Sequence, residues 1–196
     1  MLANLLTLLR LVLAAGFAAG VALAGPGHAL SAGWLTLLLI LAGGAELTDL
    51  LDGPLARARG AAGRVGGLLD PLCDALSRLT LYFAAALAGW VALAVPLVMV
   101  GRDLLVAYCR VFQAYMNWPT SARFSGKAKA VIQGSALLAL VVLAGRQESY
   151  AQPARLGIGA LVIAVTLWSL FDYLRLGIPA ALAMHRQDRR QGQGRN

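Results

Sequence analysis

The chain has 196 residues, of which 59% are hydrophobic and 13% are charged. A soluble globular domain carries about 25% charged residues, and a disordered chain has far fewer apolar ones. The composition therefore excludes a disordered chain, argues against an ordinary soluble domain and predicts a membrane protein.

The net charge is +8, from 17 Lys and Arg against 9 Asp and Glu. In a chain built of apolar stretches, this excess favours anionic lipid and phosphate-bearing substrates as partners, and not nucleic acid. The two cysteines, Cys73 and Cys109, lie far apart without metal-ligand spacing. We interpret both as small core residues.

Six apolar stretches are each long enough to cross a bilayer core about 30 Å thick, at about 1.5 Å per residue. They predict an all-α, polytopic membrane protein with six transmembrane helices. Residues 1–176 are expected to form one six-helix transmembrane domain, and residues 177–196 a basic cytoplasmic tail. The stretches cover residues 3–24, 32–52, 65–89, 92–116, 128–146 and 155–176.

The first stretch carries polar residues at every third position, namely Asn4, Thr7 and Arg10. This spacing places them on one stripe of a helix. A cleaved signal peptide has an uninterrupted apolar centre and needs no such stripe. We therefore expect the first stretch to be a helix of the mature bundle.

Lys and Arg are unevenly shared between the loops, and cytoplasmic loops of membrane proteins are enriched in them. The loops near 25–32 and 89–96 contain none, whereas those near 53–64 and 117–127 and the tail are basic. Only Arg146 and Arg155 fall on the opposite side. Both termini are therefore predicted to be cytoplasmic, in a multi-pass protein of the cytoplasmic (inner) membrane.

Four carboxylates gather where the second stretch ends and the third begins. Asp49 and Asp52 are spaced i, i+3, and Asp70 and Asp74 are spaced i, i+4, so each pair shares one helix face. Four facing carboxylates need counter-charge, and oxygen ligands suit two Mg²⁺ or Mn²⁺ ions, the usual clamp for displacement at phosphorus. A buried ion network, or the cation or proton pathway of a transporter, is the alternative interpretation.

The carboxylates belong to the pattern D-x2-D-G-x2-A-R-x8-G-x3-D-x3-D, which begins at Asp49. This pattern resembles the signature of the CDP-alcohol phosphotransferase family of integral membrane enzymes at all eight fixed positions. The resemblance implies two divalent cations held by the four aspartates, with Asp74 also acting as general base. It implies a homodimer, and a CDP-linked donor bound near Asn4, Thr7, Asp49, Gly53, Ala56, Arg57 and Gly66.

Three later segments resemble glycerol-3-phosphate phosphatidyltransferases of this family: 101–106, 125–129 and 166–173. A phosphorylated acceptor needs basic side chains, which could also be anchors for anionic lipid headgroups. Three features depart from the pattern. Ala75 stands where Lys is common, Gly63 stands where a hydroxyl residue is common, and Glu46 is an additional acid without an assigned role. The candidate acceptor-phosphate residues are Arg110, Arg123, Lys127 and Lys129.

The resemblance thus implies transfer of a phosphatidyl group from CDP-diacylglycerol to an alcohol at the cytoplasmic side, with release of CMP. Glycerol 3-phosphate is the favoured acceptor, and inositol phosphate, phosphatidylglycerol and serine remain open. A cation or proton transporter and a non-catalytic membrane scaffold are the alternatives from other classes.

Overall fold

The computed structural model describes residues 2–25, 30–58, 66–118, 124–146 and 149–193. Within these ranges, the side chains of residues 2–5, 7, 49–58, 66–70 and 187–193 lie outside the description. The described chain forms six helices and no strand, which confirms the predicted all-α class. The helices are α1 (Leu2–Ala24), α2 (Ala32–Ala58), α3 (Gly66–Leu87), α4 (Ala94–Tyr115), α5 (Phe124–Ala144) and α6 (Ala151–Gln193).

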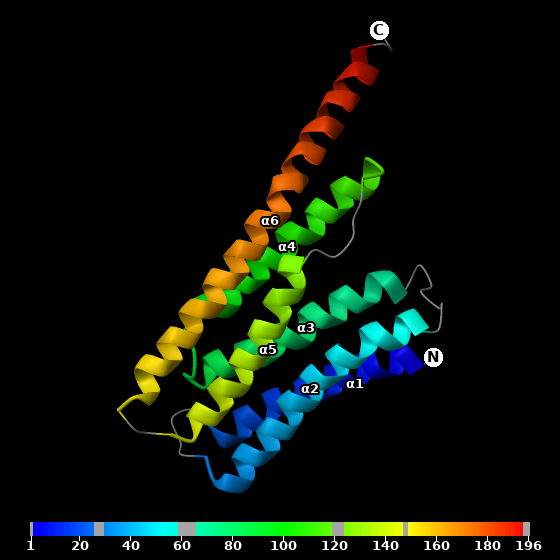
Figure 1. Ribbon diagram of the computed structural model, residues 1–196. Helices are drawn as coiled ribbons and strands as arrows, with labels where there is room; N and C mark the ends of the chain where they lie inside the picture. The colour runs from blue at the N-terminus through cyan, green and yellow to red at the C-terminus, as the bar shows by residue number, and fades with distance from the viewer. Residues whose placement is uncertain (1, 26–29, 59–65, 119–123, 147–148, 194–196) are drawn as a thin grey trace.

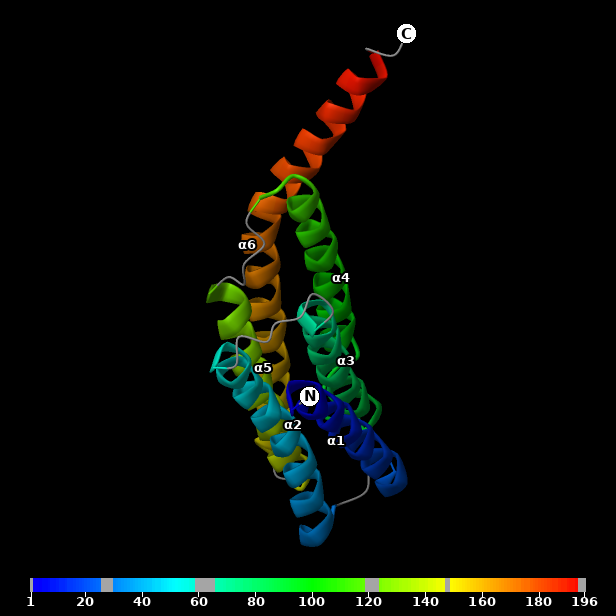
Figure 2. The ribbon, with the colours of Figure 1, turned by 90° about the vertical axis from the view of Figure 1, so that its right-hand side faces the viewer.

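Consecutive helices run in opposite directions, so the start of α1, the end of α2 and the start of α3 lie at the same end of the bundle (Figure 1). In the packing of these helices, α1 contacts both α2 and α3, α4 contacts α6, and α5 contacts α2, α3 and α6. Figure 2 shows α1 between α2 and α3, with α4 and α6 forming a separate pair behind them.

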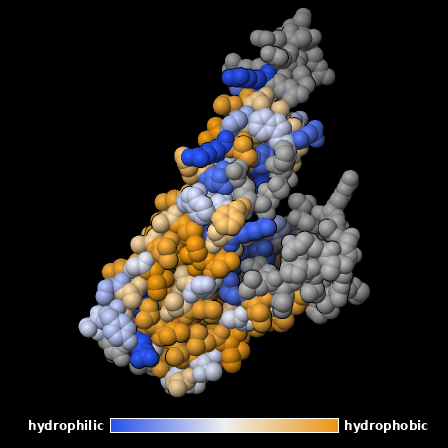
Figure 3. Space-filling model, viewed as in Figure 1, coloured by the Kyte–Doolittle hydropathy of each residue, from blue (hydrophilic) through white to orange (hydrophobic). Residues whose placement is uncertain are grey.

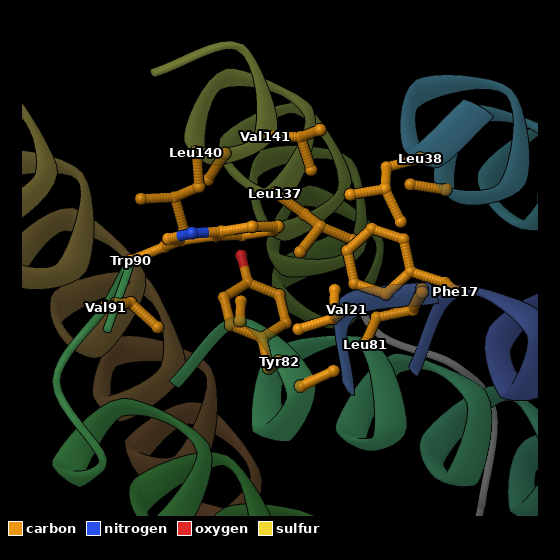
Figure 4. Close-up of a cluster of buried hydrophobic side chains, with 14 of the residues drawn as sticks. Phe17, Val21, Leu38, Leu81, Tyr82, Trp90, Val91, Leu137, Leu140 and Val141 are labelled. Carbon is orange, nitrogen blue, oxygen red and sulfur yellow. The ribbon is translucent and has the colours of Figure 1, made fainter. Parts of the chain in front are cut away.

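The hydrophobic core occupies the end of the bundle opposite to the start of α1. Phe17 of α1 packs edge-on against Trp90, with ring centroids 6.2 Å apart. Leu38 of α2, Leu81 of α3 and Leu137 of α5 complete the contact (Figure 4). Gly89 has a φ of +77° and ends α3 with a left-handed turn that brings Trp90 back over the core.

The last helix is longer than the sixth apolar stretch. It has 43 residues, which corresponds to about 65 Å, roughly twice the thickness of a bilayer core. The apolar stretch that ends at residue 176 therefore covers only part of α6, and the helix continues into the basic segment (Figure 1).

Much of the surface in the lower part of the view in Figure 3 is apolar. Exposed large side chains such as Leu156, Leu161 and Phe171 line α6. Within the part that the structure describes, two segments are long and apolar enough to cross a membrane, and α1 and α2 contain shorter apolar ones (Leu8–Ala24 and Ala32–Thr48). The two long segments are Phe124–Ala144 and Ala151–Arg186. Six crossings and the orientation of the termini stay predictions.

Candidate active site

The four signature aspartates lie on α2 and α3 near the end of the bundle where α1 begins (Figure 1). Asp49 and Asp52 are one turn apart in the last third of α2, and Asp70 and Asp74 are one turn apart at the start of α3. Only Asp74 has a described side chain, which is half-buried. The side chains of the donor-site candidates Asn4, Thr7, Gly53, Ala56, Arg57 and Gly66 also lie outside the described part.

Asp74 forms an ion pair with Arg10 of α1. Arg10 is only 2% exposed, and its Nε also donates a hydrogen bond of 3.5 Å to the Thr48 hydroxyl, next to Asp49 on α2. One buried guanidinium therefore links α1 to both helices that carry the aspartates. The sequence signal for this role was the polar stripe of α1, whose third member is Arg10, although we predicted only Asn4 and Thr7 as site residues.

Glu46, which had no predicted role, forms an ion pair with Arg78 of α3. The Glu46 Oε2 atom accepts a hydrogen bond of 3.0 Å from the Arg78 Nη2 atom. The partner lies 32 residues along the chain, so the sequence spacing gave no signal for this contact.

A basic cluster connects α4, α5 and α6 on the side of the bundle away from α1. Arg102 and Lys129 both donate to the Asp103 carboxylate, at 2.7 and 2.9 Å, and Arg102 also donates to the Ser169 hydroxyl at 2.7 Å. Lys129 is 5% exposed. The single negative charge of Asp103 offsets only one of the two positive charges of Arg102 and Lys129. The Arg102–Asp103–Lys129 group therefore keeps a net positive charge.

Tyr173 of α6 extends this cluster. Its hydroxyl accepts a hydrogen bond of 3.1 Å from Arg110, and the guanidiniums of Arg102 and Arg110 lie 5.2 and 5.4 Å from its ring centroid. Both distances suit a cation–π contact. Ser125, at the start of α5, donates to the Asp172 carboxylate. Through its hydroxyl and its ring, Tyr173 orients Arg110. The sequence alone did not predict this role for Tyr173.

The predicted acceptor-phosphate residues divide into three groups. Arg110 and Lys129 belong to the cluster and have partners within it. Lys127 is exposed, two residues before Lys129 on α5. Arg123 lies outside the described residues. The structure thus brings Arg110 and Lys129 together through Tyr173, Arg102 and Asp103.

Metal binding was predicted for the four aspartates. Among the described side chains, no group of three or more His, Cys, Asp or Glu residues could hold a metal ion, and three of the four predicted ligands are not among them. The donor chemistry fits a hard divalent cation, because the set consists of carboxylates only and the described member, Asp74, is half-buried.

We expect Asp74→Ala to destabilise the protein more than Asp74→Asn. Alanine removes the acceptor opposite a buried guanidinium, whereas asparagine keeps an oxygen in the same place, so the difference should be about 1–2 kcal/mol. Thermal unfolding of both purified variants in detergent measures it. Equal unfolding midpoints would contradict the structural role of the Arg10–Asp74 pair.

Comparison with known proteins shows the family of the chain. The family model of the CDP-alcohol phosphatidyltransferases matches residues 1–174. A CDP-diacylglycerol–glycerol-3-phosphate 3-phosphatidyltransferase of Sodalis glossinidius is 33% identical over 137 residues, which are 66% of this chain and 72% of the relative. One of Haemophilus influenzae is 29% identical over 146 residues, 72% of this chain and 75% of the relative. The chain therefore belongs to the CDP-alcohol phosphatidyltransferase family.

Proposed function

We propose that this protein transfers the phosphatidyl group of CDP-diacylglycerol to glycerol 3-phosphate and releases CMP, a step of phospholipid biosynthesis. The observation that carries the proposal is the family match over residues 1–174, together with relatives that bear this activity in their names. The basic cluster of α4, α5 and α6 supports the choice of a phosphorylated acceptor.

The reaction is a displacement at phosphorus. The acceptor hydroxyl oxygen forms a bond to the lipid-bearing phosphorus, the bond from that phosphorus to the oxygen of CMP breaks, and CMP leaves. Asp74 receives the proton of the acceptor hydroxyl, because a carboxylate is a proton acceptor and its half-buried side chain stays partly accessible to a substrate. Arg57 binds the diphosphate, and the remaining donor site consists of Asn4, Thr7, Asp49, Gly53, Ala56 and Gly66.

Two divalent cations, Mg²⁺ or Mn²⁺, complete the proposed site. Asp49, Asp52, Asp70 and Asp74 would hold them through carboxylate oxygens. When bound, such cations offset the charge of the diphosphate and of the leaving group. The chain's own contribution is the placement of these ligands on α2 and α3, which Arg10 links to α1.

The acceptor phosphate would bind to Arg110, Arg123, Lys127 and Lys129. The phosphate is a dianion, and the shared carboxylate of Asp103 leaves the Arg102–Asp103–Lys129 group one positive charge in excess before Arg110 and Lys127 are counted. Charge-assisted hydrogen bonds of this kind distinguish a phosphorylated acceptor from serine. Inositol phosphate and phosphatidylglycerol remain the alternatives that share this chemistry.

We further propose that all six helices cross the cytoplasmic membrane, with both termini and the site on the cytoplasmic side. The apolar outer surface and the two long apolar segments support the membrane, and the basic loops support the orientation. The family resemblance supports a homodimer.

We expect Asp74→Asn to abolish CMP release from CDP-diacylglycerol, because the amide cannot accept the proton of the acceptor hydroxyl. Nucleotide release by the purified variant with glycerol 3-phosphate and Mg²⁺ or Mn²⁺ measures this loss. The control is that the variant is still folded at the assay temperature, as thermal unfolding shows, and turnover at the level of the unmodified protein would contradict the assignment of the base.

We expect Lys127→Ala to raise the KM for glycerol 3-phosphate about tenfold or more and to leave the KM for CDP-diacylglycerol unchanged. The lost contact is a charged hydrogen bond to phosphate, typically about 1.5–3 kcal/mol. Initial rates at varied acceptor and donor measure both constants. Arg146→Ala, at the opposite end of the bundle, is the matched control for an exposed cation. Equal effects of both variants on the acceptor KM would contradict the proposed phosphate site.

A further inference from the structure

We propose that Glu46 and Arg78 form a positioning pair for the active site. Their ion pair fixes the longitudinal register of α2 against α3 and so sets the relative positions of the two helix segments that carry the aspartates. This inference rests on the proposed function, in which the four aspartates hold two divalent cations.

The two residues occupy equivalent places on the two helices. Glu46 lies three residues before Asp49, and Arg78 lies four residues after Asp74. Both are thus one helical turn deeper in the bundle than the signature aspartates and on the same helix faces. Their contact therefore joins α2 directly to α3 one turn away from the aspartates.

The pair is enclosed within the bundle. The Arg78 and Glu46 side chains are 11% and 15% exposed, and the 3.0 Å hydrogen bond joins them directly. Gly134 of α5 lies against the Glu46 carboxylate, and a Cβ atom at Gly134 would come within 2.8 Å of the Glu46 Cδ atom. Because Gly134 has no side chain, the Glu46 carboxylate can occupy this space.

A second contact fixes the same level of α3 against α5. One turn beyond Arg78, the Tyr82 hydroxyl donates a hydrogen bond of 2.7 Å to the main-chain carbonyl of Gln133, the neighbour of Gly134. Three helices are thereby held together in one layer. A shift of α2 by one residue, about 1.5 Å, would take Glu46 away from both Arg78 and Gly134.

General stabilisation does not account for this pair. Taking two charges out of water costs free energy that their attraction only partly returns, and well-packed apolar replacements of buried pairs are often neutral or stabilising. A buried pair can instead select one arrangement of helices, as polar residues do in coiled coils. The Glu46–Arg78 pair lies one turn below the aspartates. An arrangement of α2 and α3 selected by this pair would therefore affect metal binding.

The test separates positioning from stability. The double variant Glu46→Leu/Arg78→Met removes both charges together, and its matched control, Gln133→Leu/Thr166→Val, removes a buried hydrogen bond of 2.8 Å between α5 and α6. Purified proteins are compared by thermal unfolding and by Mn²⁺ titration, in which electron paramagnetic resonance reports free Mn²⁺. Loss of a group bonded directly to a metal ligand typically weakens metal binding about 10–100-fold, and we expect an effect at the lower end of this range for a pair that acts through the register of the helices.

We expect the Glu46/Arg78 double variant to keep its unfolding midpoint and to bind Mn²⁺ at least tenfold more weakly, with a matching rise in the Mn²⁺ needed for CMP release. The Gln133/Thr166 control should keep the affinity of the unmodified protein. A folded Glu46/Arg78 variant with unchanged Mn²⁺ affinity would overturn the inference.

A milder variant covers the case in which the double variant does not fold. Gly134→Ala keeps both charges but places a methyl group where the Glu46 carboxylate lies, whereas Gly43→Ala meets only Leu138 at 4.0 Å. We expect weaker Mn²⁺ binding from Gly134→Ala alone, and equal affinities of the two alanine variants would overturn the inference. Failure of the proposed function is distinguishable, because the unmodified protein itself would then neither bind Mn²⁺ nor release CMP.

Discussion

A charged side chain buried between apolar helices must find a partner, because its desolvation is otherwise too costly. The buried cations of this chain meet that constraint with contacts between helices. Arg10 joins α1 to α3, Arg78 joins α3 to α2, and Lys129 joins α5 to α4. These contacts fix the arrangement of the helices at the end where the signature aspartates lie, and the chemistry we propose depends on that arrangement.

The bundle is divided along its length. Apolar side chains such as Phe17, Leu81 and Leu137 pack at one end (Figure 4), and the ion pairs between helices lie toward the other. The apolar end holds the helices together without directional preference, whereas the ion pairs select one rotation and one register for each helix. An active site that must hold a diphosphate and a phosphorylated acceptor in line needs both kinds of contact.

The sequence predicted the six helices, because each apolar stretch is long and is separated from the next by a segment that contains glycine, proline or charged residues. It also predicted that the four aspartates lie on two neighbouring helices, since those spacings are local, whereas their role as metal ligands stays a prediction. It could not predict the partner of Glu46 or the sharing of Asp103 by Arg102 and Lys129, because these contacts join residues far apart in the chain. The length of α6 was also missed, because hydropathy marks only the apolar part of a helix that continues into a basic segment.

The proposed activity requires CDP-diacylglycerol as donor and a phosphorylated alcohol as acceptor. A panel of acceptors, offered to the purified protein with CDP-diacylglycerol and Mg²⁺ or Mn²⁺, tests it most directly. We expect metal-dependent CMP release with glycerol 3-phosphate and no release above background with serine. Release with serine and none with glycerol 3-phosphate would contradict the role of the basic cluster of α4, α5 and α6.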